Sequence, residues 1–507
     1  MAKKKSQASY YLDFVADQPL VAENVYRDAQ RISTPLPSFA EARDKLPEPM
    51  WEGHDAAIEA YWRVWELAFG NIRHPQPLTG FVCNFIDTAF NDCLFLWDTC
   101  FILMFTRYGN RAFHFQQTLD NLYAAQRDDG FITRERQEWD GQARFHPHDP
   151  VSTGPNVFAW AEWEYFQQTA DHDRLARIFP VLLAYHRWMR THRSWPSGAY
   201  WSCGLACGMD NQPRLPENYD VHVEHGHMCW IDATAQAAFS ADLLQRMAQV
   251  LGREDEVSDL REENEQLTSW INDVAWDEVS GFYYDVRREG SISGFQSIAG
   301  FWPLLAGQAS AEQAARLVEH LEDEKTFNRY HRVPSMSASD SDYEPTGAYW
   351  RGSVWPPTTY MILRGLTRYG YDDLAHAIAR NHHDNVMAVY NETGTVWENY
   401  APEKAAPGQP AKRDFVGWGG LGPVAVLFEY IFGLRPDVSE NRLVWDVRLT
   451  EGHGVKRYPF GTEGVLDLYC PGRQNPNERP EIDVQTNIPL EVELIWSGGR
   501  ETISVSP

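Results

Sequence analysis

The stretch Pro356–Val389, PPTTYMILRGLTRYGYDDLAHAIARNHHDNVMAV, has the pattern of two helices joined by a tight turn. Its two leading prolines suit the first turn of a helix, where a missing backbone N–H removes no intrahelical hydrogen bond. Gly370 follows the first helix, and a glycine at this place supplies the left-handed cap that ends a helix. The stretch therefore predicts a helical hairpin, Pro356–Tyr369 followed by Tyr371–Val389.

The same organisation recurs from about residue 54 to residue 434. Apolar residues recur at i, i+3, i+4 and i+7, and Gly109 and Gly252 follow helix ends as Gly370 does. Each of these ends precedes a short polar turn and another helix. The helices that we expect are Asp55–Phe69, Leu94–Tyr108, Ala112–Gln126, Asn156–Thr169, Arg174–His192, Asp232–Leu251, Glu254–Ala275, Ser297–Ala306, Ala311–Leu321, Pro356–Tyr369, Tyr371–Val389 and Gly420–Phe432.

Successive hairpins of about twelve helices predict a toroid with an inner and an outer ring. An irregular α-solenoid is the alternative, but no clean repeat of 34 or 40 residues is visible. We assign residues 51–435 to the helical barrel and residues 1–50 to a lead-in of short strands and turns. Residues 436–507 form a small β-rich appendage, with strands expected at Arg442–Leu449, Gly464–Tyr469, Ile482–Thr486 and Leu490–Trp496.

Composition limits the classes of partner. Lys and Arg number 45 and Asp and Glu 71, so the net charge of −26 repels nucleic acid and anionic lipid. No run of about 18 apolar residues appears, so no membrane span is expected. Seven cysteines in mostly apolar surroundings predict free buried thiols. Without a secretory signal in MAKKKSQASYYLDF, we expect a cytoplasmic protein, and nothing in the sequence indicates its oligomeric state.

Two carboxylates stand in loop-like sequence rich in glycine, proline and aromatic residues. They are Asp210, in Gly208-Met209-Asp210-Asn211, and Glu398, in Thr395–Pro402. Hydrolysis of a glycosidic bond needs two such carboxylates, contributed by different parts of the chain and facing each other across a sugar. Each on its own could instead be a solvated turn residue. We predict that Asp210 and Glu398 are the catalytic pair.

Nearby segments carry candidate sugar contacts. Asp98 follows Trp97, so a carboxylate could accept hydrogen bonds from hydroxyls while an indole covers a sugar face, although Asp98 would also suit a helix N-cap. Gln126 is a better candidate than Asp129, which fits an ordinary Asp-Gly turn. The remaining substrate-binding candidates are Tyr349, Trp350, Arg351, Trp355, Trp397, Trp418 and Gly419.

Arg351 lies close to two tryptophans and could hold a carboxylate or a sugar hydroxyl. A buried arginine paired with a core acid is an equal alternative. Glycines around Trp418 would let backbone and indole approach a ligand closely.

Other chemistries compete weakly. Cys203, Cys207 and Cys229 with His225 and His227 match no regular zinc spacing, and the acidic run at 340–344 suits a solvated loop better than a calcium site. Neither GxGxxG, nor the P-loop motif, nor GxSxG occurs. We therefore expect no metal and no cofactor.

These segments together resemble the trehalase-like glycoside hydrolases. The resemblance is greatest to family 63 and to the related mannosylglycerate and glucosylglycerate hydrolases. The shared motifs, in family order over roughly residues 90 to 432, are Leu96-Trp97-Asp98-Thr99, Gln126 with Asp129-Gly130-Phe131, Gly208-Met209-Asp210-Asn211, Trp276-Asp277, Gly281-Phe282-Tyr283-Tyr284-Asp285, Tyr349-Trp350-Arg351-Gly352, Trp355-Pro356-Pro357, Glu398-Asn399-Tyr400 and Gly417-Trp418.

The resemblance implies an (α/α)6 barrel and an inverting α-glycosidase, with Asp210 as general acid and Glu398 as general base. It places Asp98, Gln126, Trp350, Arg351 and Trp418 against the sugar before the cleaved bond. The family's set of glycerate-binding residues, in a mobile loop, has no match here, so the sugar and its aglycone stay open.

We therefore predict an inverting exo-α-glycosidase that hydrolyses a small α-glucoside or α-mannoside, such as a disaccharide, an oligosaccharide or a glycosylglycerate. The alternatives are a non-catalytic carbohydrate-binding protein on the same barrel and a hydrolase of another linkage, such as an α-rhamnoside. A binding module would not need two opposed carboxylates, which favours the enzyme.

Overall fold

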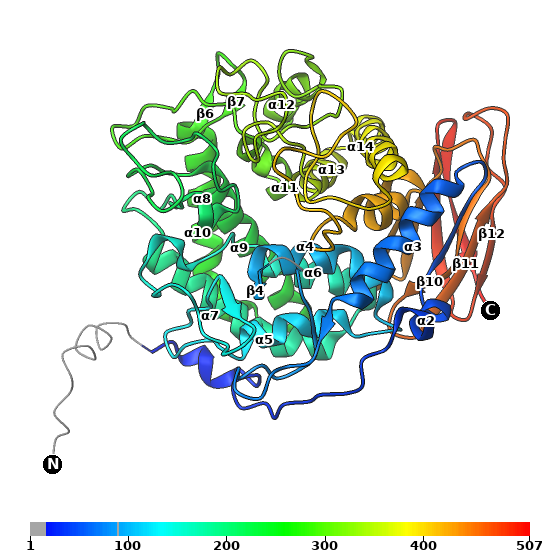
Figure 1. Ribbon diagram of the computed structural model, residues 1–507, viewed down its shortest axis with the longest axis horizontal. Coiled ribbons are helices and arrows are strands. Elements are labelled where there is room, and N and C mark those ends of the chain that lie inside the picture. The colour runs from blue at the N-terminus through cyan, green and yellow to red at the C-terminus, as the bar shows by residue number, and fades with distance from the viewer. Residues whose placement is uncertain (1–16, 89–90) are drawn as a thin grey trace.

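The computed structural model describes residues 17–88 and 91–507, and within them the helices form two concentric rings (Figure 1). Each helix of the inner ring contacts the next, and the last contacts the first, so the ring is closed. The inner helices are α4 (Leu96–Thr106), α6 (Phe158–Thr169), α9 (Ile231–Leu251), α11 (Trp302–Ala306), α13 (Pro356–Arg368) and the π-helix η9 (Leu421–Ile431).

The outer helices alternate with the inner ones along the chain. α14 packs on α13 and η9, α3 packs on η9, and α7 and α10 pack on α9. This alternation around a closed inner ring is the predicted (α/α)6 barrel. The outer segments are α3 (Asp55–Gly70), η4 (Phe115–Leu119) with α5 (Asp120–Tyr123), α7 (His172–His192), α10 (Ser258–Trp270), α12 (Ala311–Glu322) and α14 (Asp372–Thr393).

None of the described helices is long and apolar enough to cross a membrane. Shorter elements connect the two rings of helices. The short helical segments are η1 (Pro19–Glu23), α2 (Phe39–Ala42), η2 (Arg43–Lys45), η3 (Arg107–Gly109), η5 (Pro150–Ser152), α8 (Gly204–Cys207), η6 (Glu254–Val257), η7 (Ile271–Ala275), η8 (Ile298–Phe301) and η10 (Val438–Glu440).

The glycines expected to end helices separate into two kinds. Gly252 and Gly370 have φ angles of 67° and 78°, which confirms the left-handed conformation expected of them. Gly109 does not adopt it. A Cβ at Gly109 would lie 2.6 Å from the ring of Trp65, so this glycine permits close packing of the chain on α3. Two predicted helices are also shorter or interrupted. The helix predicted from Leu94 begins at Leu96, because Cys93–Phe95 forms a strand, and residues 112–126 contain only η4 and α5.

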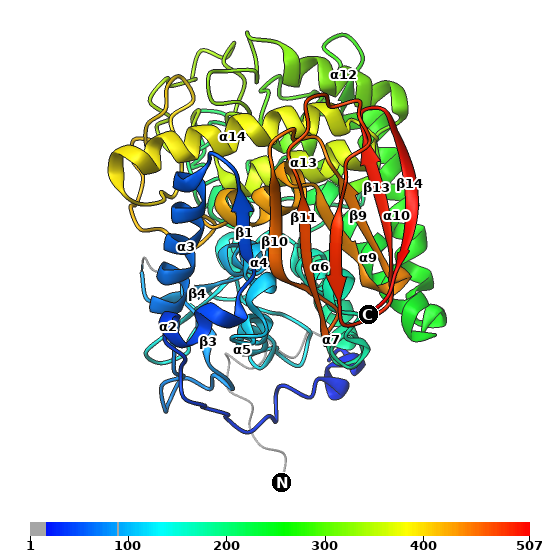
Figure 2. The same ribbon diagram turned by 90° about the vertical axis from the view of Figure 1, so that its right-hand side faces the viewer.

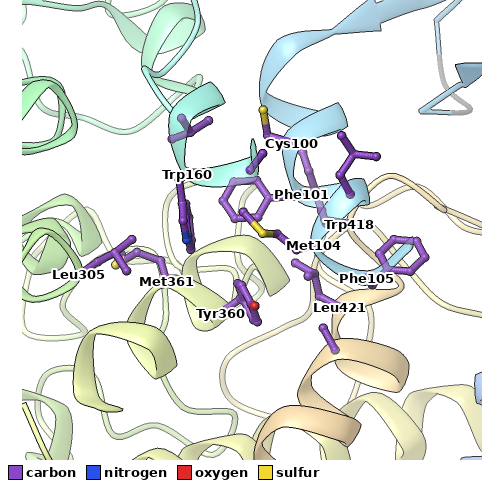
Figure 3. Packing of buried hydrophobic residues seen from close by; sticks show 14 of the residues in the cluster. Cys100, Phe101, Met104, Phe105, Trp160, Leu305, Tyr360, Met361, Trp418 and Leu421 are labelled. Atoms are coloured by element: carbon purple, nitrogen blue, oxygen red, sulfur yellow. The ribbon is translucent and has the colours of Figure 1, made fainter. Parts of the chain in front are cut away.

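Large side chains fill the middle of the barrel (Figure 3). Phe101 of α4 meets Trp160 of α6 edge to face at 5.7 Å, and Trp160 stacks on Tyr360 of α13 at 6.0 Å. All three are buried. Burying a side chain of this size stabilises the fold by about 1.5–3 kcal/mol. This aromatic layer also separates the two ends of the barrel from each other.

The C-terminal region adds two four-stranded sheets beside the barrel (Figure 2). Their strand orders are β1-β10-β11-β12 and β14-β13-β9-β8. The strands are β1 (Glu48–Trp51), β8 (Leu434–Asp437), β9 (Arg442–Asp446), β10 (His453–Phe460), β11 (Gly464–Cys470), β12 (Asp483–Thr486), β13 (Leu490–Trp496) and β14 (Gly499–Val505).

Strands β9, β11, β12 and β13 confirm the four strands predicted in this region, whereas β10 and β14 were not predicted. Strand β1 comes from the lead-in and pairs antiparallel with β10, so that Glu48 lies opposite Lys456. The shorter two-stranded pairs are β2 (Ile72–Arg73) with β3 (Phe85–Ile86), β4 (Cys93–Phe95) with β5 (Glu135–Gln137), and β6 (Trp276–Asp277) with β7 (Phe282–Tyr283).

A cavity of about 380 Å³ lies where the C-terminal ends of the inner helices approach the sheets. Two arginines and two glutamates form a closed set of ion pairs in it. Arg107 contacts Glu164 at 3.0 Å and Glu429 at 2.7 Å, and Arg364 contacts the same two glutamates at 2.5 and 3.6 Å. Although burial acts to raise it, the two arginines hold the pKa of Glu164 below its usual value. The charges of this cavity are therefore matched within the protein.

Candidate active site

A second cavity, of about 280 Å³, lies at the opposite end, where the inner helices begin. Four carboxylates line it, and three of them, Asp98, Asp210 and Glu398, come from segments far apart in the sequence. The structure thus brings most of the predicted site residues to one place. Those that line the cavity are Trp97, Asp98, Asp210, Tyr349, Trp350, Glu398 and Trp418.

Asp98 lies in the first turn of α4 and is buried. It does not cap the helix, because the N-cap residue is Phe95. Among the described residues, neither its Oδ1 atom nor the indole N–H of Trp97 has a hydrogen-bond partner. Burial, helped by the charges of Glu398 and Asp210, raises the pKa of Asp98 to about 8. A neutral Asp98 can both donate and accept hydrogen bonds, as a sugar hydroxyl requires.

Glu398 is buried in the segment between α14 and η9. Its Oε1 accepts a hydrogen bond from the Tyr349 hydroxyl at 3.0 Å, and its Oε2 accepts one from the Lys412 backbone N–H at 3.1 Å. The Trp418 indole N–H donates to the Glu398 carbonyl at 2.6 Å. Burial raises the pKa of Glu398, whereas the two donors to its carboxylate act to lower it. These donors favour the ionised form.

Asp210 is half-buried and is the third residue after the end of α8. Burial raises the pKa of Asp210, and the positive charge of Arg134 opposes that effect. Gly208 brings this loop against Trp97, since its φ is 77° and an added Cβ would lie 3.0 Å from the indole. Any side chain at residue 208 would therefore strain the backbone and displace Trp97.

Tyr349 and Trp350 reach the cavity from an unusual turn. Ala348 and Tyr349 have φ angles of 36° and 68°, although neither is glycine. Such conformations cost of order 1–3 kcal/mol each and are found most often at functional sites. Trp350 is held by Trp355, whose ring stacks on it at 3.9 Å with an interplanar angle of 2°.

A wider cavity of about 490 Å³ adjoins the enclosed one. Asp210 and Tyr349 line both cavities, and Asn211, His222, Ala348, Gln409 and Pro410 complete the wider one. Asp210 therefore stands at the junction of the two cavities, while Glu398 faces only the enclosed one. A molecule that occupied both would place the bond between its two parts beside Asp210.

Gln126 and Arg351, predicted to bind substrate, do not line either cavity. The Gln126 amide donates to the carbonyls of Gly130 and Val181 at 3.0 and 2.9 Å, so it braces a turn. Arg351 forms an ion pair with Asp342 at 2.6 Å on a half-exposed surface, which is neither of the two alternatives expected for it.

Trp355, Trp397 and Gly419 also lie behind the lining residues. Trp355 supports Trp350, and the Trp397 indole donates to the Thr393 hydroxyl at 3.0 Å. A Cβ at Gly419 would lie 2.2 Å from the carbonyl of Phe415, so this glycine permits a close backbone crossing rather than a ligand contact.

A group of lining residues around Arg134 and Glu135 was not predicted from the sequence. These two follow the Gly130 turn and enter strand β5, which pairs with β4 directly before α4. Arg134 contacts Glu135 at 2.5 Å and donates to the carbonyl of Leu205 at 2.6 Å. In the sequence, the charged run Arg134-Glu135-Arg136 suggests a solvent-exposed segment. Only the pairing of β5 with β4 shows that this segment is buried. In the described residues, no group of three or more His, Cys, Asp or Glu is placed to hold a metal ion.

A family model matches the part of the chain that forms this cavity. Residues 93–418 match the mannosylglycerate hydrolase MGH1-like glycoside hydrolase domain, and this range includes every lining residue of the enclosed cavity except Asn91. The chain belongs to this family. It is therefore an MGH1-like glycoside hydrolase, as the resemblance of its motifs implied.

Individual relatives of this MGH1-like chain are distant. The mannosylglycerate hydrolase of Thermus thermophilus is 27% identical over 298 residues, which cover 47% of this chain and 69% of that protein. A probable mannosyl-oligosaccharide glucosidase of Schizosaccharomyces pombe is 24% identical over 292 residues, which cover 49% of this chain but only 34% of the yeast protein.

The crystal structure of the family 63 mannosylglycerate hydrolase from Thermus thermophilus in complex with glucose is 22% identical, with a TM-score of 0.58. The likeness covers 72% of this chain and 99% of that one, and it shows a shared fold.

Proposed function

We propose that this glycoside hydrolase is an inverting exo-α-glycosidase that hydrolyses a small α-glucoside or α-mannoside. The observation that supports this proposal most is the convergence of Asp210 and Glu398, about 190 residues apart in the sequence, on one enclosed cavity. Family membership makes hydrolysis the reaction, and Asp210 and Glu398 are two of the four carboxylates that line the cavity.

Their surroundings favour different roles for the two acids. Glu398 accepts two hydrogen bonds that favour its ionised form, which suits a general base that takes a proton from water. Asp210 lies at the junction of the two cavities, where the glycosidic oxygen of a bound substrate would lie, and burial favours its protonated form. We assign Asp210 as the general acid and Glu398 as the general base.

The reaction then follows the inverting course. Asp210 donates its proton to the leaving oxygen, while Glu398 removes a proton from a water that attacks the anomeric carbon on the opposite face. Inverting enzymes hold the two carboxyl groups roughly 6.5–9.5 Å apart, which leaves room for that water.

The enclosed cavity supports an exo mode of action on a small substrate. Its volume of about 280 Å³ is near the lower limit of the roughly 300–1,000 Å³ that is usual for small-molecule sites. Trp97, Trp350 and Trp418 offer indole faces or edges to a sugar ring, and Asp98 offers a buried carboxyl group. The wider cavity would hold the aglycone. Relatives named as a mannosylglycerate hydrolase and a glucosidase favour mannose or glucose as the sugar.

The test has two parts. Asp210→Asn and Glu398→Gln should each lower kcat by about 10²–10⁴-fold and still bind substrate, because each removes one proton transfer. Near-normal turnover by either purified variant would remove that residue from its role. The substrate panel comprises nitrophenyl α-glucoside, α-mannoside and α-rhamnoside with natural disaccharides and glycosylglycerates.

NMR of fresh product tests the stereochemistry. An inverting enzyme that cleaves an α-glycoside releases the β-anomer first, so early α-anomer would contradict the proposal. Release of rhamnose alone would replace the sugar assignment. Sugar binding without hydrolysis across the whole panel would favour the non-catalytic alternative on this barrel.

A further inference from the structure

The side chain of Asn211, next to Asp210, brackets the unusual turn that carries Tyr349. Its Nδ2 donates to the carbonyl of Ala348 at 3.0 Å, and its Oδ1 accepts from the backbone N–H of Trp350 at 2.9 Å. One amide thus satisfies the backbone groups on either side of Tyr349. The bracket spans 137 residues of sequence in one bond and 139 in the other, so it joins two separate loops.

The turn needs such support. Ala348 and Tyr349 have positive φ angles in succession, and residues with a Cβ keep this conformation only where the surroundings enforce it. A further hydrogen bond supports the turn, because the Trp355 indole N–H donates to the Tyr349 carbonyl. At 3.3 Å, this bond is weaker than the two bonds of Asn211. The Asn211 amide supplies two shorter bonds at the point of strain.

Tyr349 transmits this placement to Glu398. Its hydroxyl lies 3.0 Å from Oε1 of Glu398 and acts on the pKa of that carboxyl as a lowering hydrogen bond. Burial raises the pKa of the Tyr349 hydroxyl itself, so the phenol stays protonated and remains a donor. A covalent and hydrogen-bonded path therefore runs from Asp210 through Asn211 and Tyr349 to Glu398.

We propose that Asn211 is a positioning residue, which holds Tyr349 against Glu398 and so fixes the base relative to the acid. This inference rests on the proposed function, since it assigns Asn211 a role through the catalytic pair. Asn211 does not need to touch the reacting atoms. Its contribution is to link the loop of the acid to the turn that supports the base.

A double-mutant cycle tests the path. Asn211→Ala and Tyr349→Phe should each lower kcat/KM by roughly 10- to 100-fold, the usual effect of losing a hydrogen bond to a charged group. The double variant should lose little more than either single variant, because both changes break the same path. If the two losses multiply, Asn211 acts independently of Tyr349 and the proposal fails.

The pH profile supplies a second readout. Loss of the Tyr349 hydrogen bond removes an influence that lowers the pKa of Glu398, so the acidic limb of kcat/KM should move to higher pH in both single variants. An unmoved limb in Asn211→Ala would overturn the proposal. Should this variant not fold, Asn211→Gln keeps the amide but lengthens its reach by one methylene, and the same shift is expected.

The chain offers a matched control in Asn381 of α14. Its amide donates to the carbonyl of Tyr330 at 2.9 Å and accepts from the Arg332 N–H at 2.8 Å, which is the same bracket around His331. Asn381 lines neither cavity. Asn381→Ala should lower the melting temperature without moving the acidic limb of kcat/KM. If Asn381→Ala moves that limb as far as Asn211→Ala does, general loosening of the fold explains the Asn211 result and the proposal fails.

The Glu398→Gln variant distinguishes failure of the proposed function from failure of the positioning role of Asn211. If Glu398→Gln keeps its activity, the proposed function fails and the path has no endpoint. If Glu398→Gln is inactive and Asn211→Ala behaves as the wild type, only the positioning role fails.

Discussion

The two ends of the barrel hold similar chemical groups in opposite states. Where the inner helices end, Arg107, Arg364, Glu164 and Glu429 neutralise one another in a closed set of ion pairs. Where the helices begin, Asp98 and Glu398 are equally buried, but no closed set of arginines surrounds them among the described residues, and burial raises the pKa of both carboxyl groups.

The comparison distinguishes buried charges that stabilise the fold from buried charges that are available to a ligand. A buried charge is costly unless it is paired, so a matched set contributes to a unique structure without leaving polar groups for a substrate. Carboxylates that outnumber the positive groups in a cavity are costly and have perturbed pKa values, which is characteristic of functional sites. The cavity that holds the closed set of ion pairs is therefore the structural one.

Among these variants, the largest loss of stability is expected from Arg107→Met. The change leaves Glu164 and Glu429 buried with only Arg364 as a positive partner, so stability to urea should fall by about 3–5 kcal/mol. The kcat of the folded fraction should stay near normal, since the aromatic layer lies between this end and the enclosed cavity that holds Asp210 and Glu398. A large loss of kcat at unchanged stability would break the assignment of the two ends.

A change at the other end should act in the opposite sense. Asp98→Asn should abolish most turnover yet leave stability at pH 7 equal or higher, because it removes an unpaired buried acid. The pKa of Asp98 is raised from 3.8 to about 8, so the wild type loses stability from this group as pH rises through that range. Each unit of raised pKa corresponds to about 1.4 kcal/mol.

The measurement for Asp98→Asn is urea unfolding from pH 4 to pH 8. The variant should show a flatter dependence on pH than the wild type. Asp232 offers a control, because it also lies in the first turn of an inner helix but pairs with Arg214 at 2.7 and 2.9 Å. Asp232→Asn should destabilise the protein at pH 7, and stabilisation there would contradict this view of paired charges.

The smallest effect is expected at the rim of the arginine-rich cavity. Arg442 pairs with Asp437 and Glu493 at 3.3 and 3.1 Å, but its side chain is 44% exposed. Arg442→Ala should change stability by about 0–1 kcal/mol, as usual for exposed ion pairs. The same urea unfolding measures this variant. If Arg442→Ala lowers the free energy of unfolding as much as Arg107→Met does, the closed set of ion pairs extends to the surface.

Much of the barrel could be predicted from local sequence. The α13–α14 hairpin follows from apolar periodicity, two prolines and Gly370, which are all properties of neighbouring residues. The cavity residues Trp97, Asp98, Tyr349, Trp350 and Trp418 were candidates because aromatic and polar groups stood together near predicted helix ends.

The predicted site residues that lie outside the cavities have a common physical explanation, which is competition for a side chain by partners that sequence does not reveal. The Gln126 amide is bound by backbone carbonyls, and the Arg351 guanidinium is bound by Asp342. Arg134 and Glu135 entered the cavity through the pairing of β5 with β4, which is separated by about 40 residues. Long-range pairing of this kind leaves no periodic signal in a single sequence.

The pairing of β1 with β10 has a consequence for synthesis of the chain. Glu48 leaves the ribosome about 400 residues before its partner Lys456 exists. At roughly 5–20 residues per second, this interval lasts about 20–80 s. During that time the hydrogen-bonding edge of β1 is unpaired, and such an edge can pair with other chains. Strand β10, made late in synthesis, therefore protects one of the earliest strands of the chain from aggregation.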